Sequence, residues 1–159
     1  MIAESYATRL LLEKAVNRAA ALNREQAHVD ALKRIVAQSK KLIRLDDMSA
    51  SRKLSGDFHA TVADATKNST LIRVYNVAAN SFPDWMLYQA MFKYPDELEQ
   101  SIKEEYQEHL AITEAIAARD AKLAERCAEE HIRDIGNQIV VYLGVPQEML
   151  DRKITQLGL

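Results

Sequence analysis

The sequence predicts an all-α protein, an antiparallel bundle of about seven or eight helices. Apolar residues recur every three or four positions along almost the whole chain, and no segment alternates as a β-strand does. Only 4 glycines and 3 prolines interrupt 159 residues that are dominated by good helix formers. One domain covering residues 1–159 is the simplest organisation at this length, and it can bury a core without disulfides.

The helices can be placed in order from this periodicity and from the residues that start or stop a helix. Asn68 or Ser69 and, later, Asp120 are expected to cap helices, because short polar side chains bond the free N–H groups of a first turn. Pro83 and Pro95 fit the first turns of two others, and Gly144 closes the seventh. The expected ranges are 3–22, 24–45, 49–67, 69–80, a short helix from 83, 95–119, 121–143 and a short helix from 146.

Charge and cysteine content narrow the classes of function. The net charge of −2 and pI near 6.1 give this chain little electrostatic attraction for nucleic acid. No apolar run has the length of a membrane span, and the first residues lack the pattern of a signal peptide. The single Cys127 fits a reduced compartment. We therefore expect a cytoplasmic protein without a membrane association.

Basic residues gather in and after the second predicted helix. Two interpretations are a solvated helix face, which is the commoner case, and a patch that docks phosphate or another domain. These residues are Lys33, Arg34, Lys40, Lys41 and Arg44.

Three of the four histidines are expected to face the core. His109 and His131 each interrupt an apolar stripe at helical spacing, and His59 lies at the margin of such a stripe beside Phe58. His28 stands in a polar stretch and is expected to be exposed.

A single buried histidine is usually satisfied by a hydrogen bond. Three on three different helices also suit a divalent metal ion, which neutral imidazole nitrogens can bind together. Both interpretations stay open on spacing alone. The chain lacks the Glu-x-x-His pairs of di-iron bundles, the His-Glu-x-x-His motif of zinc proteases and the Gly-x-Ser-x-Gly elbow of hydrolases.

Four segments together resemble the FCD domain, the effector-binding C-terminal domain of the FadR-type branch of GntR transcription regulators. They are Phe58-His59 followed by Asn68 and Leu71, the segment EHLAITEAIAARD, the segment AEEHIRDI, and TRLLLEKAVNRAAA near the N-terminus. The separation of 22 residues between His109 and His131 also agrees with that family. The similarity covers nearly the whole chain.

The resemblance implies a metal site. In metal-binding members three histidines and an aspartate hold a divalent ion, commonly zinc or nickel, and His59, His109 and His131 match the histidines. The aspartate position, four residues before the first histidine, is Ser55 here, which could hold a water in its place. Asp57 is two residues from His59, roughly 200° round the helix, and is a poor substitute. We therefore expect weaker binding than in a four-ligand site.

The resemblance also implies a partner for that site, a small organic acid whose carboxylate meets the metal and a basic side chain. Arg9 matches the family's first-helix arginine and is the candidate, although it could equally form only an intrahelical pair with Glu13 worth ~0.3–0.5 kcal/mol. The family pairs as a homodimer and binds DNA through an N-terminal winged helix, which is absent from this chain. A fragment and a stand-alone sensor both remain possible.

We therefore expect a ligand-sensing and dimerisation domain, and not an enzyme. One alternative is a helical metalloenzyme that activates water at an open three-histidine site. It needs a general base near the metal, and no carboxylate is assigned to the core. The other alternative is a metal-free interaction module in which the histidines only pack.

Overall fold

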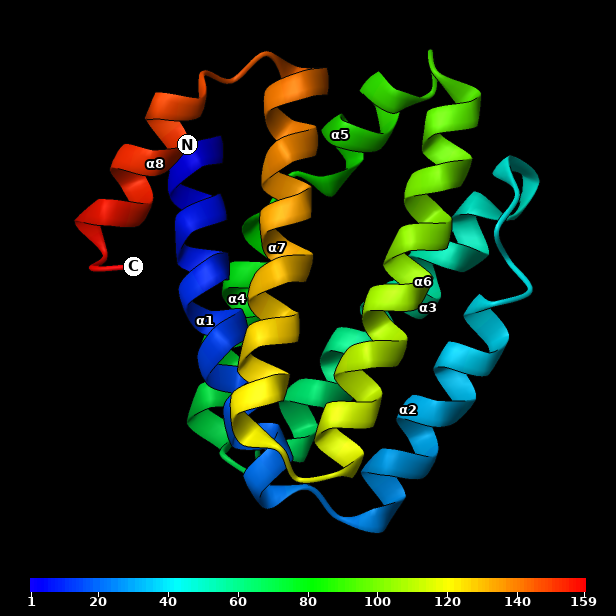
Figure 1. Cartoon of the computed structure of the whole chain (residues 1–159), viewed down its shortest axis with the longest axis vertical. Coiled ribbons are helices and arrows are strands. Elements are labelled where there is room, and N and C mark those ends of the chain that lie inside the picture. Colours follow the sequence, from blue (N-terminus) through cyan, green and yellow to red (C-terminus); the bar gives the residue numbers. More distant parts are fainter.

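The computed structural model describes residues 1–159 as eight α-helices and one short 3-10 helix, with no strand (Figure 1). The all-α prediction and the expected number of helices are confirmed. The elements are α1 (Ile2–Asn23), α2 (Gln26–Ser39), η1 (Leu45–Asp47), α3 (Met48–Ala65), α4 (Ser69–Ser81), α5 (Asp84–Met91), α6 (Pro95–Ala117), α7 (Ala121–Leu143) and α8 (Gln147–Gln156).

The predicted caps are found where the sequence placed them. The Asn68 side chain accepts hydrogen bonds from the backbone N–H groups of Thr70 and Leu71 at the start of α4. Asp120 accepts from the N–H group of Leu123 and so begins α7. Gly144 ends α7 with a φ of +66°, a conformation that glycine adopts without the steric cost of a Cβ.

The second helix is shorter than predicted, because α2 ends at Ser39 and not near Leu45. The chain then leaves the helix and forms η1 just before α3. Ile43 and Leu45 thereby pack against a cluster that includes Met48 and Leu87. Apolar spacing continues through this segment, but it serves a different part of the core, and this is why periodicity alone extended the helix.

The core consists of three apolar clusters. The largest is built on Phe58, Leu32 and Ile116 and lies in the half of the bundle where α2, α3 and α6 meet α1 and α7. A second joins α1, α7 and α8 around Leu10 and Ile139, and a third joins α5 and α6 to Met48. Between these clusters lie the buried polar residues from which the site is built.

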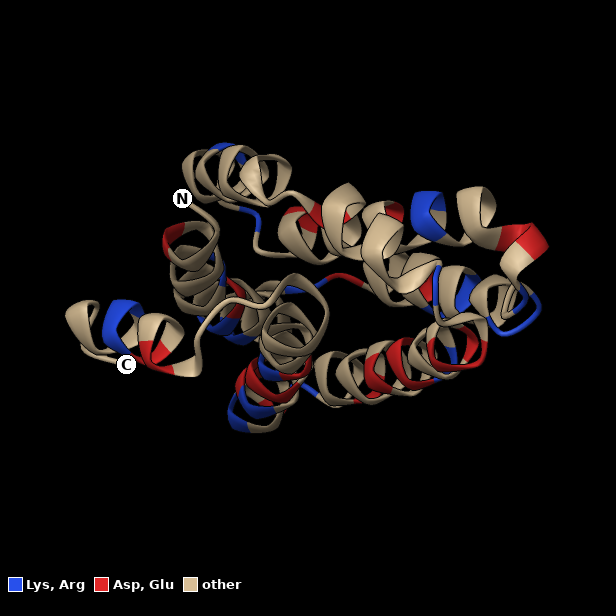
Figure 2. Cartoon of the chain, turned by 90° about the horizontal axis from the view of Figure 1, so that it is seen from above, with Lys and Arg blue, Asp and Glu red and all other residues tan.

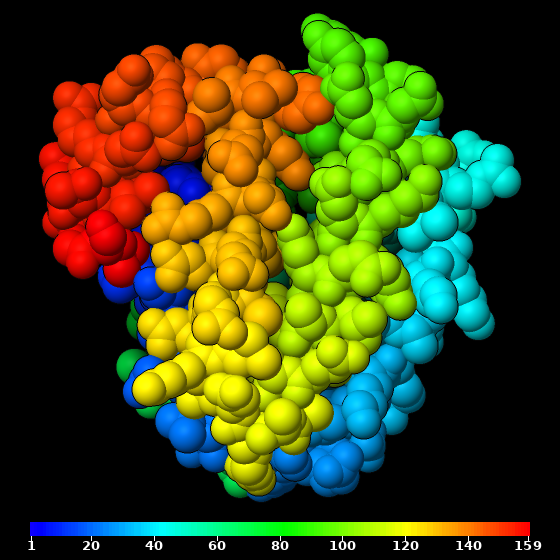
Figure 3. Space-filling model, in the orientation of Figure 1, coloured from blue at the N-terminus to red at the C-terminus, as the bar shows by residue number.

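The first helix is the central element. It contacts α3, α4, α6, α7 and α8, and its longest contact is with α7. That contact is close because Gly136 faces Tyr6, so that a Cβ at position 136 would lie 2.4 Å from the tyrosine hydroxyl oxygen. In Figure 3, α7 and α6 run side by side along one face, and α8 forms a projection at the edge beside α1.

Acidic and basic residues are interspersed along the helices (Figure 2). The five basic residues in and after α2 that the sequence analysis singled out are all exposed, as a solvated face requires. None of the helices combines the length and the apolar character that crossing a bilayer requires.

Candidate metal centre and adjoining cavity

Three buried histidines meet between α3, α6 and α7. His59, His109 and His131 are 8%, 2% and 2% exposed, and each offers a ligand nitrogen within 4.8 Å of the other two. Their ring centroids lie 5.0, 5.1 and 5.4 Å apart. The structure therefore brings together the three histidines that the sequence analysis selected, and they could hold a metal ion.

The apolar stripes of the helices position these rings. On α6, His109 shares its buried face with Ile112 and Ile116, and on α7, His131 shares its face with Ala128. Phe58 stacks on the His109 ring, with centroids 3.9 Å apart and an interplanar angle of 11°. The adjacent Phe58 and His59 thus have separate roles. Phe58 stacks on the ring of His109, whereas the ring of His59 packs against those of His109 and His131.

The histidine nitrogens fit a divalent ion. The Nε2 atoms of His109 and His131 are buried without any hydrogen-bond partner. A buried polar atom in this state costs about 1–3 kcal/mol, and a metal ion would satisfy both atoms at once. Burial holds the pKa values of His59 and His109 well below their usual range, which keeps both rings in the neutral form that binds metals.

Carboxylates contact the other nitrogens of two of these rings. Glu108 Oε2 lies 2.6 Å from His131 Nδ1, and Glu13 Oε1 lies 3.4 Å from His59 Nδ1. A carboxylate on the second nitrogen orients a metal-binding imidazole and raises its basicity. The expectation that no carboxylate lies in the core beside the histidines was therefore wrong.

Glu13 is a buried hub that joins three helices. It is 1% exposed, and its Oε1 accepts hydrogen bonds from Tyr75 Oη at 2.7 Å and Arg9 Nε at 3.3 Å. Its Oε2 accepts from Asn17 Nδ2 at 3.2 Å. From the sequence, Glu13 is expected only to pair with Arg9 within the helix, although the spacing of Arg9, Glu13 and Asn17 places all three on one face of α1.

A second ionic group, formed between α3 and α6, also lies beside the histidines. Glu105 of α6 pairs with Arg52 and accepts a 2.7 Å hydrogen bond from Ser55 Oγ. Burial opposes ionisation of Glu105, but the guanidinium of Arg52, which pairs with this carboxylate, outweighs burial and holds its pKa well below the usual range. Asp57 instead pairs with Lys53 at the surface, so it is the poor substitute for a metal ligand that the sequence analysis expected.

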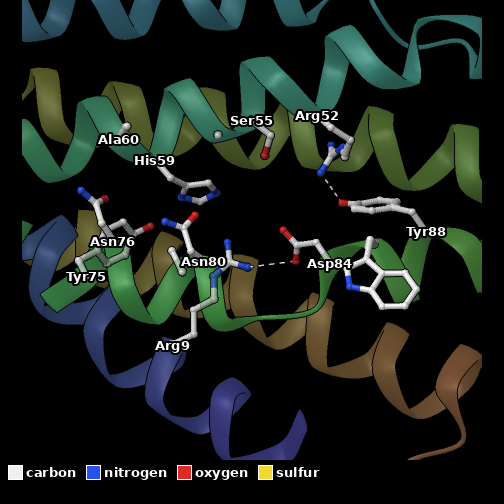
Figure 4. A pocket seen from close by; sticks show the side chains of 13 residues that line it. Arg9, Arg52, Ser55, His59, Ala60, Tyr75, Asn76, Asn80, Asp84 and Tyr88 are labelled. Atoms are coloured by element: carbon white, nitrogen blue, oxygen red, sulfur yellow. Dashed lines mark hydrogen bonds and ion pairs between the residues drawn. The ribbon is translucent and has the colours of Figure 1, made fainter. Parts of the chain in front are cut away.

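A cavity of about 580 Å³ adjoins the histidines (Figure 4). This volume is typical of sites for small organic molecules. His59 lines this cavity and also belongs to the group of three histidines, so the cavity lies next to that group. The lining residues are Arg9, Arg52, Ser55, Gly56, His59, Ala60, Tyr75, Asn76, Ala79, Asn80, Asp84, Trp85 and Tyr88.

Arg9 projects into this cavity from α1 (Figure 4). Its Nε donates to Glu13, its Nη1 donates to Asp84 Oδ1 at 3.4 Å, and its guanidinium lies 5.3 Å from the centre of the Phe82 ring. Arg9 therefore forms the pair with Glu13 and also lines the cavity, while its role as the effector anchor stays a prediction. Arg52, which the sequence analysis counted in no motif, enters from α3 and stacks on Tyr88.

The expectation for His28 was wrong. His28 is half-buried, and its Nδ1 accepts a hydrogen bond from the backbone N–H of Glu25 at the start of α2. It serves as the N3 residue of a capping box, a role usually filled by Glu or Gln.

Together these features define an all-helical domain in which a cavity the size of a small molecule adjoins three histidines able to hold a metal ion. The chain belongs to the FCD domain family, whose family model matches residues 4–134. The resemblance found in the sequence is thereby confirmed.

One relative is a longer protein that contains a segment similar to this chain. The chain is 30% identical over 128 residues to the HTH-type transcriptional repressor NanR of Citrobacter rodentium (strain ICC168). The aligned region covers 80% of this chain. The matched region is 46% of that repressor, so the chain spans about half the length of this relative.

Proposed function

We propose that this chain is the effector-sensing and dimerisation domain of a GntR-type transcription regulator. It binds a small organic acid at or beside a divalent metal ion in the bundle core. The observation that carries this proposal is that His59 lines both the cavity and the group of three histidines. Its family membership and its similarity to a transcriptional repressor support a regulatory role, not an enzymatic one.

In this proposal His59, His109 and His131 are the metal ligands, and the ion is zinc or nickel. Both metals accept imidazole nitrogen, which suits a site whose three strongest candidate ligands are histidines. When bound, the ion supplies a positive centre that attracts the carboxylate of the effector. Ser55, at the wall of the cavity, supports the centre on its open side, where it can also hold a water.

Arg9 is the proposed anchor for the effector carboxylate. Arginine offers two parallel N–H donors to a carboxylate, and this guanidinium already lines the cavity. Asn76 and Asn80, on the same wall of α4, supply amide groups for further polar contacts. The effector is thus expected to be polar as well as anionic.

Regulation would follow from a shift between two arrangements of a homodimer. An effector that binds one arrangement more tightly changes the spacing of attached DNA-binding domains, while equal affinity for both would change nothing. In this proposal a winged-helix domain outside this chain contacts DNA. The regulator acts in the cytoplasm.

The metalloenzyme remains the alternative, because Glu13, Glu105 and Glu108 all lie next to the histidines. Glu13 and Glu105 are held by arginines, and Glu108 is held by His131 Nδ1. A general base must be free to accept a proton from bound water, so these pairings favour a sensor. Turnover in a hydrolase and lyase screen of metal-loaded protein would favour the alternative.

Thermal melting of chelator-stripped protein, titrated with zinc and nickel, tests the metal centre. An ion that binds only the folded state at 100 times its Kd adds about 2.7 kcal/mol, which raises the Tm of a domain of this size by roughly 5–11 °C. His131→Ala should remove most of this rise. Equal responses from the two proteins would show that the histidines are packing residues and not ligands.

The same assay tests the effector. A panel of small carboxylic acids is added to metal-loaded wild type and to Arg9→Gln. We expect at least one acid to raise the Tm of the wild type and to lose this effect in the variant. An acid that stabilises both proteins equally would exclude Arg9 as its anchor.

A further inference from the structure

The metal centre lacks the aspartate that the family pattern places one helical turn before His59. Ser55 occupies that position on α3, so this helix contributes one histidine and no carboxylate. The α6 helix, however, has a carboxylate four residues before its histidine, the spacing that α3 lacks. Glu105 stands four residues before His109, and residues four apart lie on the same helix face.

Glu105 lies close to an unpartnered ligand nitrogen. Its Oε1 is 3.9 Å from His109 Nε2, one of the two buried histidine nitrogens without a hydrogen bond. The side chain is 16% exposed and borders two small cavities, one of which is lined by His109 and the other by His131. Glu105 thus lies beside the unsatisfied Nε2 of His109 and borders a small cavity that His131 also lines.

We propose that Glu105 is the carboxylate ligand of the metal centre and replaces the aspartate that position 55 lacks. This inference rests on the proposed function, because it requires that the three histidines bind an ion. Glu105 Oε2 stays paired with Arg52, and Oε1 keeps its hydrogen bond from Ser55 while its other lone pair binds the ion. Ser55 then supports the centre by positioning this carboxylate.

The other two buried carboxylates are in the wrong place for this role. Glu13 faces His59 Nδ1, and both of its oxygens already accept hydrogen bonds from Arg9, Asn17 and Tyr75. Glu108 contacts His131 Nδ1, which is not the unsatisfied nitrogen of that ring. Glu13 and Glu108 therefore contact the Nδ1 atoms of His59 and His131, where each can orient the imidazole ring without binding the ion.

The distance to His109 allows Glu105 to share an ion with that ring after a small movement. Two ligands of a tetrahedral zinc ion, each about 2.1 Å from the metal, stand roughly 3.4 Å apart. The 3.9 Å between Glu105 Oε1 and His109 Nε2 must close by about 0.5 Å to reach this separation. The histidine nitrogens, which lie up to 4.8 Å apart, must close by more than that.

With Glu105 as a fourth ligand, the weaker binding that Ser55 led us to expect from the sequence no longer follows. If no carboxylate reached the metal, Ser55→Asp would complete the site and tighten binding. If Glu105 already binds the ion, an aspartate at position 55 has no coordination position left to fill. It would also stand next to the negative charge of Glu105. The effect of Ser55→Asp should therefore depend on which residue occupies position 105.

The test is metal affinity, measured by competition between zinc and a chelator, together with the visible absorption of the cobalt-substituted protein. Glu105→Gln should weaken zinc binding more than about 100-fold, because loss of an outer partner of a ligand already costs 10–100-fold. The cobalt spectrum should change as well. Ser55→Asp should do little to the wild type but should restore most of the affinity of Glu105→Gln. The exposed neighbour Glu104→Gln is the matched control and should leave both readouts unchanged.

The outcomes separate this inference from the proposed function. No zinc binding by the wild type would overturn both. Binding that His131→Ala abolishes but Glu105→Gln weakens by less than about 100-fold would overturn the role of Glu105 alone. If Glu105→Gln does not fold, Ser55→Asp in the wild type decides, since a strong gain in affinity overturns the inference and an unchanged affinity supports it.

Discussion

Glu13→Gln is the substitution that most directly tests the buried hub on α1. Glutamine keeps the volume of glutamate but removes the charge and replaces one acceptor oxygen with an NH₂ group. The wild-type carboxylate accepts hydrogen bonds on both oxygens, from Arg9 and Tyr75 on one and Asn17 on the other. Whichever way the amide is turned, its NH₂ group faces a donor that it cannot satisfy.

The loss of charge sets the magnitude. Arg9 is 6% exposed, and without Glu13 its remaining acidic partner is Asp84, whose side chain is 49% exposed. Removing one partner of a buried ion pair typically costs 3–5 kcal/mol. A domain of this size loses about 2–4 °C of Tm per kcal/mol, so the Tm should fall by roughly 6–20 °C.

Urea unfolding followed by circular dichroism measures the free energy of unfolding of metal-free protein. Glu130→Gln is the control, because Glu130 is exposed and forms none of the ion pairs. A surface change of this kind is usually within 0.5 kcal/mol of wild type. A loss below about 1 kcal/mol for Glu13→Gln, no larger than that of an ordinary mutation, would refute the hub.

A double-mutant cycle identifies the cause of the loss. Arg9→Met leaves Glu13 buried without its cation, and the pair of substitutions removes both charges together. The double variant should be less destabilised than the sum of the two single variants, because neither charge is then left unpaired. Additive losses would show that Arg9 and Glu13 do not stabilise each other.

Two further predictions concern packing and assembly. Gly136→Ala should destabilise the fold, because the new Cβ would lie 2.6 Å from Cζ of the buried Tyr6 ring. Overpacking of this kind costs about 1–3 kcal/mol, and the higher helix propensity of alanine offsets only about 1 kcal/mol of that cost. Gly56→Ala, where nothing lies within 4 Å of the new Cβ, is the control in urea unfolding and should be neutral or stabilising. Light scattering should give twice the 18.0 kDa chain mass, because Val77 of α4 and Trp85 of α5 leave apolar surface exposed, and a monomeric mass would contradict the dimer.

Much of the fold and the group of histidines followed from local rules. Asn68, Asp120 and Gly144 mark helix ends through their own backbone chemistry, so each could be placed without knowledge of its neighbours. His109 and His131 interrupt stripes that must face the core, so both had to point inward. The periodicity thus predicted that these rings are buried, and the structure confirms it.

The acidic residues of the site could not be found in this way. Glu13 and Glu105 lie among residues that look like the solvated face of a helix, and their burial depends on which arginine the packing brings to them. Arg52 reaches Glu105 across 53 residues of sequence, and Tyr75 reaches Glu13 across 62. Contacts between residues so far apart in the sequence depend on how the helices cross. The spacing of residues within one helix gives no information about that crossing.

The position of Glu13 also bears on how an effector would be sensed. It holds the proposed effector anchor Arg9 on one side and the proposed ligand His59 on the other, and both contacts are made by the same oxygen. An acid that draws the guanidinium towards itself weakens one of these contacts and leaves the oxygen freer to orient the imidazole. Effector and metal would then affect each other's binding, and linkage requires that each change the other's affinity by the same factor.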